Sequence, residues 1–186
     1  FMIDPNKLID ATKAHMQQAV THLESELTKI RAGRANPSMI DSVQVDYYGS
    51  HMPVNQVANV SIQDARTIMI QPWEKSMLVP IEKAIQAANL GFNPQNDGIV
   101  IRISVPQLTE ERRKELVKKA KAEAEHAKVG IRNHRRESNE AIKRDSKGLP
   151  EDQVKSLEAN IQKMTDQFIA AVDKHVEAKE KEIMTV

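Results

Sequence analysis

The sequence predicts an α+β protein with an elongated L shape: an antiparallel three-helix bundle with a small β/α domain inserted after its first helix. Three observations lead to this prediction. Apolar residues recur at three- and four-residue steps near the N-terminus and throughout two long C-terminal segments. Between these segments the pattern changes to alternating apolar runs separated by turn residues, as in short strands. The length of 186 residues suffices for two small domains, each with its own core.

The domain boundaries follow from these changes of pattern. The bundle is expected to comprise 1–32 and 107–186, and the β/α domain is expected to comprise 33–106. Two chain segments therefore cross from one domain to the other. We expect them to form a flexible two-strand hinge at Gly33, Val105 and Pro106.

The first helix is predicted over 5–31. Asp4 can cap its N-terminus, and Pro5 suits the first helical position because that residue needs no backbone N–H partner. The apolar positions define a face for partner helices: Ile9, Met16, Val20, Leu23, Leu27 and Ile30.

The middle segment is predicted to form strands and one short helix. Strands with one buried face are indicated by alternation in Val43–Val45–Tyr47, in Ile68–Ile70 and in Ile99–Ile101–Ile103–Val105. A short helix fits 76–89, with Pro80 in its first turn and Gly91 just after its end.

Two long helices complete the prediction. The first begins after Thr109 as N-cap and ends before Gly148, and the second covers 151–184. The short connection between them predicts antiparallel neighbours. Each repeats apolar or small residues along one seam, namely Val117, Ala120, Ala124, Ala127, Ile131, His134, Ser138 and Ala141, then Val154, Leu157, Ile161, Met164, Phe168, Ala171, His175 and Ala178.

Composition excludes several classes of protein. Charged residues are 28% of the chain but the formal net charge is +1, so any attraction to a polyanion must come from a local patch. The chain has no cysteine, which excludes disulfides and thiolate metal sites and suits a reducing compartment. No apolar run approaches the roughly 20 residues of a membrane span, and no signal peptide is recognisable. We expect a cytoplasmic protein without a membrane partner.

No catalytic motif is present. The chain lacks a phosphate-binding loop, a dinucleotide fingerprint, a zinc-protease helix motif and a nucleophile elbow. The six histidines are scattered; His15 and His22 share one helix face, but surface or seam packing explains them better than a metal. We therefore expect no catalytic residue, no cofactor and no metal site.

Arginines cluster in the stretch GIRNHRRESN of the first long C-terminal helix. On a helical wheel with Ile131 at zero, four basic residues fall at about 60°, 100°, 40° and 140°, beside the seam. We call them the basic flank: Lys128, Arg132, Arg135 and Arg136. Glu137 and Glu140 fall on the other side.

Two interpretations of the basic flank are open. It could be a solvated face with ion pairs, although Lys128, Arg132 and Arg136 are spaced by four and repel one another. Alternatively it binds a polyanion, because the guanidinium fork matches phosphate oxygens. No aromatic residue is interleaved with the basic residues, which disfavours base stacking and favours the phosphates of folded RNA. Arg31 and Arg34, at the exit of the first helix, form a second basic point. For Arg31, complementing the helix dipole would suffice.

Several stretches match a known family. The chain contains, in this order, KIRAGRANPSMID, ARTIMIQPWEKSM, VPQLTEERRKEL, GIRNHRRESNEAIK and QKMTDQFIAAVD. In order and spacing these stretches resemble bacterial ribosome recycling factors over nearly the whole chain. The resemblance departs at GSHMP in 49–53, and at Gly130, where relatives have a helix former.

The resemblance implies a non-enzymatic translation factor with an L-shaped bundle-plus-β/α fold and a flexible hinge. Such a factor would bind the post-termination ribosome, mainly the large-subunit RNA, and promote subunit dissociation and release of mRNA and tRNA. Elongation factor G would be its partner and would hydrolyse the GTP. The family's RNA-contacting arginines correspond to Arg132, Arg135 and Arg136, and a related role is implied for Arg31 and Arg34.

Two alternative functions remain at this stage. The inserted domain could hold an unrecognised enzyme, or the bundle could be a coiled-coil scaffold that binds other helices. Because the seams are used within the bundle, we expect a monomer.

Overall fold

The computed structural model describes residues 3–185. The chain divides into two compact units, one made of Phe1–Ala32 with Glu110–Val186 and the other of Gly33–Thr109. We call the first the bundle and the second the sheet unit, and we describe each by itself. Within 3–185 no helix is long and apolar enough to cross a membrane.

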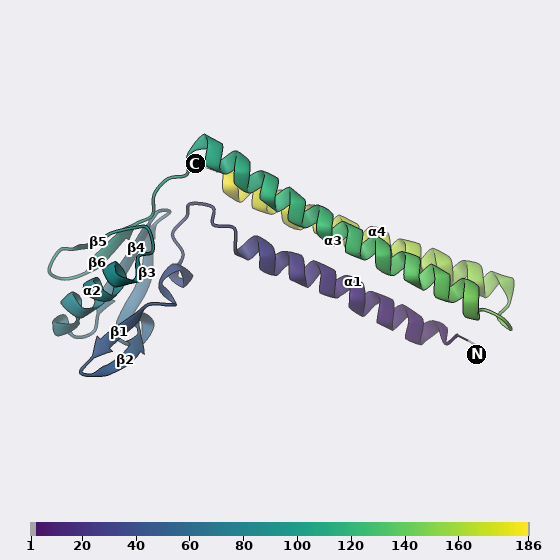
Figure 1. The fold of residues 1–186 in the computed structure, drawn as a ribbon, viewed down its shortest axis with the longest axis horizontal. Coiled ribbons are helices and arrows are strands. Elements are labelled where there is room, and N and C mark those ends of the chain that lie inside the picture. The colour runs from purple at the N-terminus through teal and green to yellow at the C-terminus, as the bar shows by residue number, and fades with distance from the viewer. Residues whose placement is uncertain (1–2, 186) are drawn as a thin grey trace. The chain divides into compact units, whose positions relative to one another are not determined.

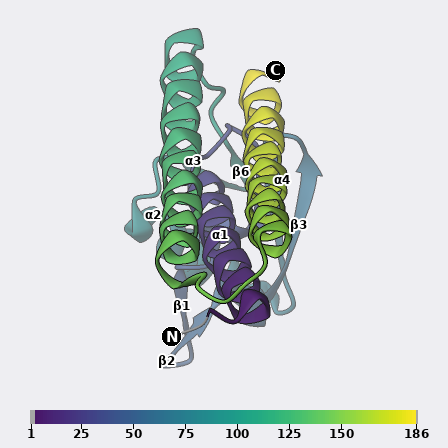
Figure 2. The ribbon, with the colours of Figure 1, turned by 90° about the vertical axis from the view of Figure 1, so that its right-hand side faces the viewer.

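The bundle consists of three helices that run side by side (Figures 1 and 2): α1 (Pro5–Thr28), α3 (Glu110–Asp145) and α4 (Glu151–Met184). Asp4 caps α1 as predicted, since its Oδ1 accepts hydrogen bonds from the backbone N–H groups of Asn6 at 3.0 Å and Lys7 at 3.3 Å. The turn between α3 and α4 contains Gly148 at φ 91°, a left-handed conformation that glycine adopts without steric cost.

The bundle core is formed by one stripe from each helix. Met16, Leu23, Ile131, Ile142, Ile161 and Ile183 are among its fully buried side chains. The predicted seam of α3 is correct at its centre, but Leu116 and Ile142 are buried in place of Val117 and Ala141. On α4, Val172 is buried, whereas the predicted seam residue Ala178 is exposed.

Two polar contacts lie between α1 and α3. The Thr12 hydroxyl donates to the Leu8 carbonyl at 2.8 Å, so Ser138 Oγ is the donor in the 2.6 Å hydrogen bond between Ser138 and Thr12. One turn further, the imidazole of His15 stacks on that of His134, with ring centroids 4.9 Å apart. Together these contacts place α1 antiparallel to α3.

The sheet unit contains two antiparallel sheets and one helix. Strands β1 (Gln44–Tyr47) and β2 (Ser50–Pro53) form a hairpin. The second sheet has the order β3-β4-β6-β5. Its strands are β3 (Ala58–Asp64), β4 (Thr67–Pro72), β5 (Pro94–Asn96) and β6 (Ile101–Ser104), and α2 (Leu78–Ala88) lies between β4 and β5 in sequence. The predicted helix 76–89 is therefore close to α2.

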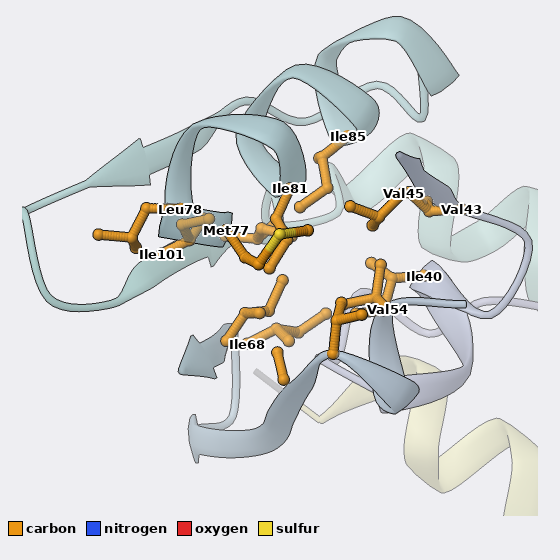
Figure 3. Packing of buried hydrophobic residues seen from close by; sticks show 14 of the residues in the cluster. Ile40, Val43, Val45, Val54, Ile68, Met77, Leu78, Ile81, Ile85 and Ile101 are labelled. Atoms are coloured by element: carbon orange, nitrogen blue, oxygen red, sulfur yellow. The ribbon is translucent and has the colours of Figure 1, made fainter. Parts of the chain in front are cut away.

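The core of the sheet unit lies between α2 and the strands (Figure 3). Ile81 and Ile85 of α2 point toward Ile68 of β4 and Val45 of β1. These four side chains are no more than marginally accessible to solvent. The predicted α+β class, with a three-helix bundle and an inserted β/α domain, is confirmed.

One predicted strand residue was wrong. Ile99 was expected on a buried strand face, but it lies in the turn before β6 and is 70% exposed. Asp97 builds this turn, since its Oδ1 accepts the backbone N–H groups of Ile99 at 2.9 Å and Val100 at 2.8 Å, and its other oxygen pairs with Arg102. The N–H group of Val100, then that of Ile99, and the Arg102 guanidinium lower the pKa of Asp97 to about 2.

The three predicted hinge residues differ in their surroundings within the sheet unit. Val105 is buried, and its N–H donates to the Arg66 carbonyl at 2.7 Å. Gly33 has φ 74°, and a Cβ at this position would lie 2.9 Å from Leu108 Cγ. Pro106 is exposed. Val105 is thus part of the core of this unit, whereas Gly33 meets the backbone requirement of a chain turn.

Candidate nucleic-acid interface

The basic flank runs along α3 for slightly more than two helical turns. α3 is positioned by its buried small-residue stripe, which includes Ala124, Ala127 and Ile131. Burial of this stripe against α1 and α4 leaves the adjacent basic side chains at the edge of the bundle: Lys128, Arg132 and Arg135 are half-buried at residue level, and Arg136 is exposed. The helix therefore presents all four on one side.

Three members of the basic flank have partners within the bundle. Lys128 Nζ lies 2.5 Å from Asp173 Oδ1 of α4, and its side chain is only 21% exposed. Arg132 Nη1 lies 3.5 Å from Glu125 Oε1, and Arg136 Nη1 donates to Asn133 Oδ1 at 3.4 Å. Lys128 thus has a structural contact that its predicted RNA role did not include.

Arg135 differs from the other three. Among residues 3–185 its guanidinium has no hydrogen bond or ion pair. A guanidinium has five N–H donors, and a phosphate accepts two of them in a bidentate geometry. Arg135 is therefore the member of the basic flank whose donors are all available to a ligand.

The sequence-based reasoning missed the acidic residues of α4 that border the basic flank. Asp173 holds Lys128, and Glu180 Oε1 lies 3.8 Å from Lys121 Nζ one heptad away. The signal was present in the sequence, because Asp166, Asp173 and Glu180 recur at intervals of seven residues. It was not recognised because only the net charge of the segment was considered, and not the spacing of its acidic residues.

The structure does not bring Arg31 close to the basic flank. The pairs Thr12–Ser138 and Ala19–Gly130 fix the alignment of α1 on α3, which puts Arg31 level with a point near Lys118. At 1.5 Å per residue, Arg31 lies about 25 Å from Arg135 along the bundle. Arg34 belongs to the sheet unit. Both side chains are exposed.

Three histidines lie at contacts between helices of the bundle. Among the described residues no group of three or more His, Asp and Glu side chains could hold a metal ion. His15 and His134 stack on each other, and His175 Nε2 lies 3.0 Å from Glu24 Oε1, which joins α4 to α1. The geometry gives these side chains roles in helix packing.

The sheet unit has two exposed aromatic side chains that the sequence analysis did not single out. Tyr48 is 73% and Trp73 is 66% exposed. The hydroxyl groups of Tyr47 and Tyr48 donate to the two oxygens of Glu74 at 2.7 and 3.0 Å, which fixes both rings. The hydrogen bond to Glu74 raises the pKa of Tyr47 above its usual range. Trp73 also borders a cavity of about 510 Å³ lined by Pro37, Ile40, Val54 and Asn55.

Comparison with known proteins identifies the family. The family model described as ribosome recycling factor matches residues 23–184. The ribosome-recycling factor of Flavobacterium psychrophilum is 56% identical over 180 residues, which covers 96% of each chain. That of Parabacteroides distasonis is 51% identical and covers 100% of each chain.

Solved structures agree with the sequence comparison. A solution structure of a ribosome recycling factor has a TM-score of 0.74 and 38% identity, and covers 100% of each chain. A second structure has a TM-score of 0.62 and 45% identity, and covers 98% of this chain and 100% of that one. It is described as the Thermus thermophilus ribosome recycling factor, with Escherichia coli elongation factor G, bound to the post-termination complex. The chain belongs to the ribosome recycling factor family.

Proposed function

We propose that this protein binds the post-termination ribosome and, with elongation factor G and GTP, promotes subunit dissociation and release of mRNA and tRNA. Membership of the family supports this proposal, as does the related structure that contains elongation factor G on a post-termination complex. The chain would act in the cytoplasm, where bacterial ribosomes work, and as a monomer, because the three helices bury their apolar stripes against one another.

The bundle binds large-subunit RNA through the basic flank. The observation that supports this most directly is Arg135, which lies beside a well-packed seam yet has no intramolecular partner among residues 3–185. Arg132 and Arg136 add charge on the same side of α3, and their contacts at 3.5 and 3.4 Å are long and exposed, so phosphate can displace them. Lys128 contributes positive electrostatic potential rather than a direct contact with RNA, because Asp173 already pairs with its ammonium group.

The protein supplies binding, and GTP hydrolysis by elongation factor G supplies the work. A catalytic role for this chain is disfavoured because its sequence contains no recognised catalytic motif. The bundle and the sheet unit act as two domains with boundaries close to 32/33 and 106–110. Flexibility between them would come from the segments around Gly33 and Pro106, with Val105 as a fixed end inside the sheet unit.

The test is binding to isolated large ribosomal subunits. Arg135→Ala is expected to weaken binding about tenfold or more, because a charge-assisted bidentate contact contributes roughly 1.5–3 kcal/mol. Arg132→Ala should weaken it less. The affinity of the unmodified protein should also fall with salt, with a log–log slope of several units.

Arg144→Ala is the matched control. Arg144 lies on the same helix, but the helical wheel puts it at about 220°, on the side of α3 away from the basic flank. Its pairing with the neighbouring Asp145 is exposed, so its loss should leave the bundle intact. Equal affinities of the Arg135 and Arg144 variants for the large subunit would refute the RNA-contact role. Arg31→Ala and Arg34→Ala, tested in the same way, would measure how much each of these arginines contributes to binding of the large subunit.

A further inference from the structure

Charged residues on α3 and α4 face one another at regular intervals. Lys121 Nζ lies 3.8 Å from Glu180 Oε1, and seven residues along each helix Lys128 Nζ lies 2.5 Å from Asp173 Oδ1. The helices are antiparallel, so residue numbers rise along α3 in the direction in which they fall along α4. The two pairs therefore define which residues stand opposite each other.

The next step of seven brings Arg135 opposite Asp166. A straight helix drifts by only about 20° per heptad, which a long arginine side chain can follow. The structure nevertheless has no ion pair at this third position. Asp166 Oδ1 instead accepts a hydrogen bond at 2.9 Å from Gln162 Nε2, one turn earlier on the same helix.

A second pairing is also missing at this place. The same alignment puts Asn139 of α3 opposite Gln162 of α4. Asn139 Oδ1 is buried and has no hydrogen-bond partner. A change of partner would supply both missing pairings. If Gln162 turned from Asp166 to Asn139, it would donate a hydrogen bond to the buried Asn139 Oδ1, and the freed carboxylate of Asp166 could form an ion pair with the Arg135 guanidinium.

We propose that Asp166 is an intramolecular competitor of RNA phosphate for Arg135. In one state, the one described here, Gln162 engages Asp166 and Arg135 is available. In the other, Gln162 engages Asn139, and Asp166 holds Arg135 across α3 and α4. Binding RNA then selects the first state. Asp166 thereby sets the affinity of the basic flank below its maximum and favours ligands whose phosphate groups can outcompete a carboxylate.

The inference rests on the RNA-binding role proposed for Arg135, and its test uses the full chain with isolated large ribosomal subunits at moderate salt. Asp166→Asn is expected to tighten binding about two- to fivefold, the range that corresponds to an exposed ion pair. Gln162→Ala should act in the opposite direction and weaken binding about twofold, because it leaves Asp166 free to hold Arg135.

Glu180→Gln is the matched control for the added net charge. It changes the charge by the same amount on the same side of α4. It lies 14 residues from Asp166, or about 21 Å along the helix, which is well beyond the Debye length of about 8 Å at physiological salt. Its effect on binding should therefore be clearly smaller than that of Asp166→Asn.

A double variant tests whether Asp166 acts through Arg135. In an Arg135→Ala background, Asp166→Asn should no longer tighten binding, because the competing guanidinium is absent. A gain that persists in that background, or one that Glu180→Gln reproduces, would overturn the competition. If Arg135→Ala weakens binding but Asp166→Asn has no effect, this inference fails and the proposed function stands. If Arg135→Ala itself leaves binding unchanged, the proposed RNA contact fails and the competition fails with it.

Discussion

Replacing Gly130 by alanine is expected to stabilise the bundle by about 0.5–1 kcal/mol, because glycine costs this much in a helix interior relative to alanine. Gly130 lies inside α3, where it faces α1. A Cβ built there would find Ala19 Cβ at 4.0 Å as its nearest neighbour from outside the turn. This is ordinary van der Waals contact, so no packing cost offsets the gain in helix propensity.

Gly33 provides the opposite case with the same substitution. Its φ of 74° is left-handed, which costs an alanine about 1–2 kcal/mol, and its added Cβ would come within 2.9 Å of Leu108 Cγ. Gly33→Ala should therefore destabilise the sheet unit by at least about 1 kcal/mol. The two glycines are distinguished by backbone conformation and space alone.

Urea unfolding followed by far-UV circular dichroism measures the first change, because most helical residues belong to the bundle. With a slope of about 2 kcal/mol per molar urea, the midpoint should rise by about 0.3–0.5 M for Gly130→Ala. Native-state hydrogen exchange then assigns each change to its own unit. A lower midpoint for Gly130→Ala would refute the reasoning, since it would mean that α1 approaches α3 too closely for a methyl group. So would an unchanged stability of Gly33→Ala.

Three other changes test the energetics. Ile161→Ala, at a fully buried position of α4, should cost about 2–5 kcal/mol of bundle stability in urea unfolding. The pKa of Asp97 is lowered to about 2 in the folded protein from its ordinary value of 3.8. The ionised Asp97 therefore stabilises the sheet unit fully above about pH 4, and this stabilisation is lost as the pH falls toward 2. Asp97→Asn should flatten this acid dependence, as measured by urea midpoints at several pH values. Glu74→Gln should lower the raised pKa of Tyr47 toward 10, which ultraviolet titration of the phenolate detects; an unchanged titration curve would contradict the role of Glu74.

The long helices were predictable from sequence because their periodic pattern extends over many turns. The predicted bounds of α4 are those of the structure. The error at Ala141 arose from continuing a strict alternation of three and four residues to the end of α3. On the wheel Ile142 falls about 20° from Ile131 and Ala141 about 80° from it, and the larger side chain, closer to Ile131, is buried.

The sheet unit was less predictable. Strand β3 (Ala58–Asp64) was missed although Ala58, Val60 and Ile62 alternate with polar residues. Its position depends on pairing with β4, a contact that sequence patterns do not report. Ile99 continued an apolar alternation, but the carboxylate of Asp97 draws its N–H into a turn. The basic flank was predictable as a cluster of charges. Which arginine is unpaired was not, because that depends on side-chain conformations: Arg132 and Arg136 contact Glu125 and Asn133 of their own helix. Asp166, opposite Arg135, accepts a hydrogen bond from Gln162 instead.

The hydroxyl pair of Thr12 and Ser138 has a consequence for how the helices find their alignment. The inner stripe of α3 is rich in alanine, so shifting α1 along it by one heptad would bring similar small residues into contact. Shifting would also separate the two hydroxyls. Thr165 is the other buried polar side chain among the described residues, and it donates only to the Ile161 carbonyl of its own helix. Its hydrogen bond would therefore be unaffected by such a shift. The buried hydrogen bond between Thr12 and Ser138, worth about 1 kcal/mol, thus acts together with the stacking of His15 on His134 to favour one register for α1 on α3.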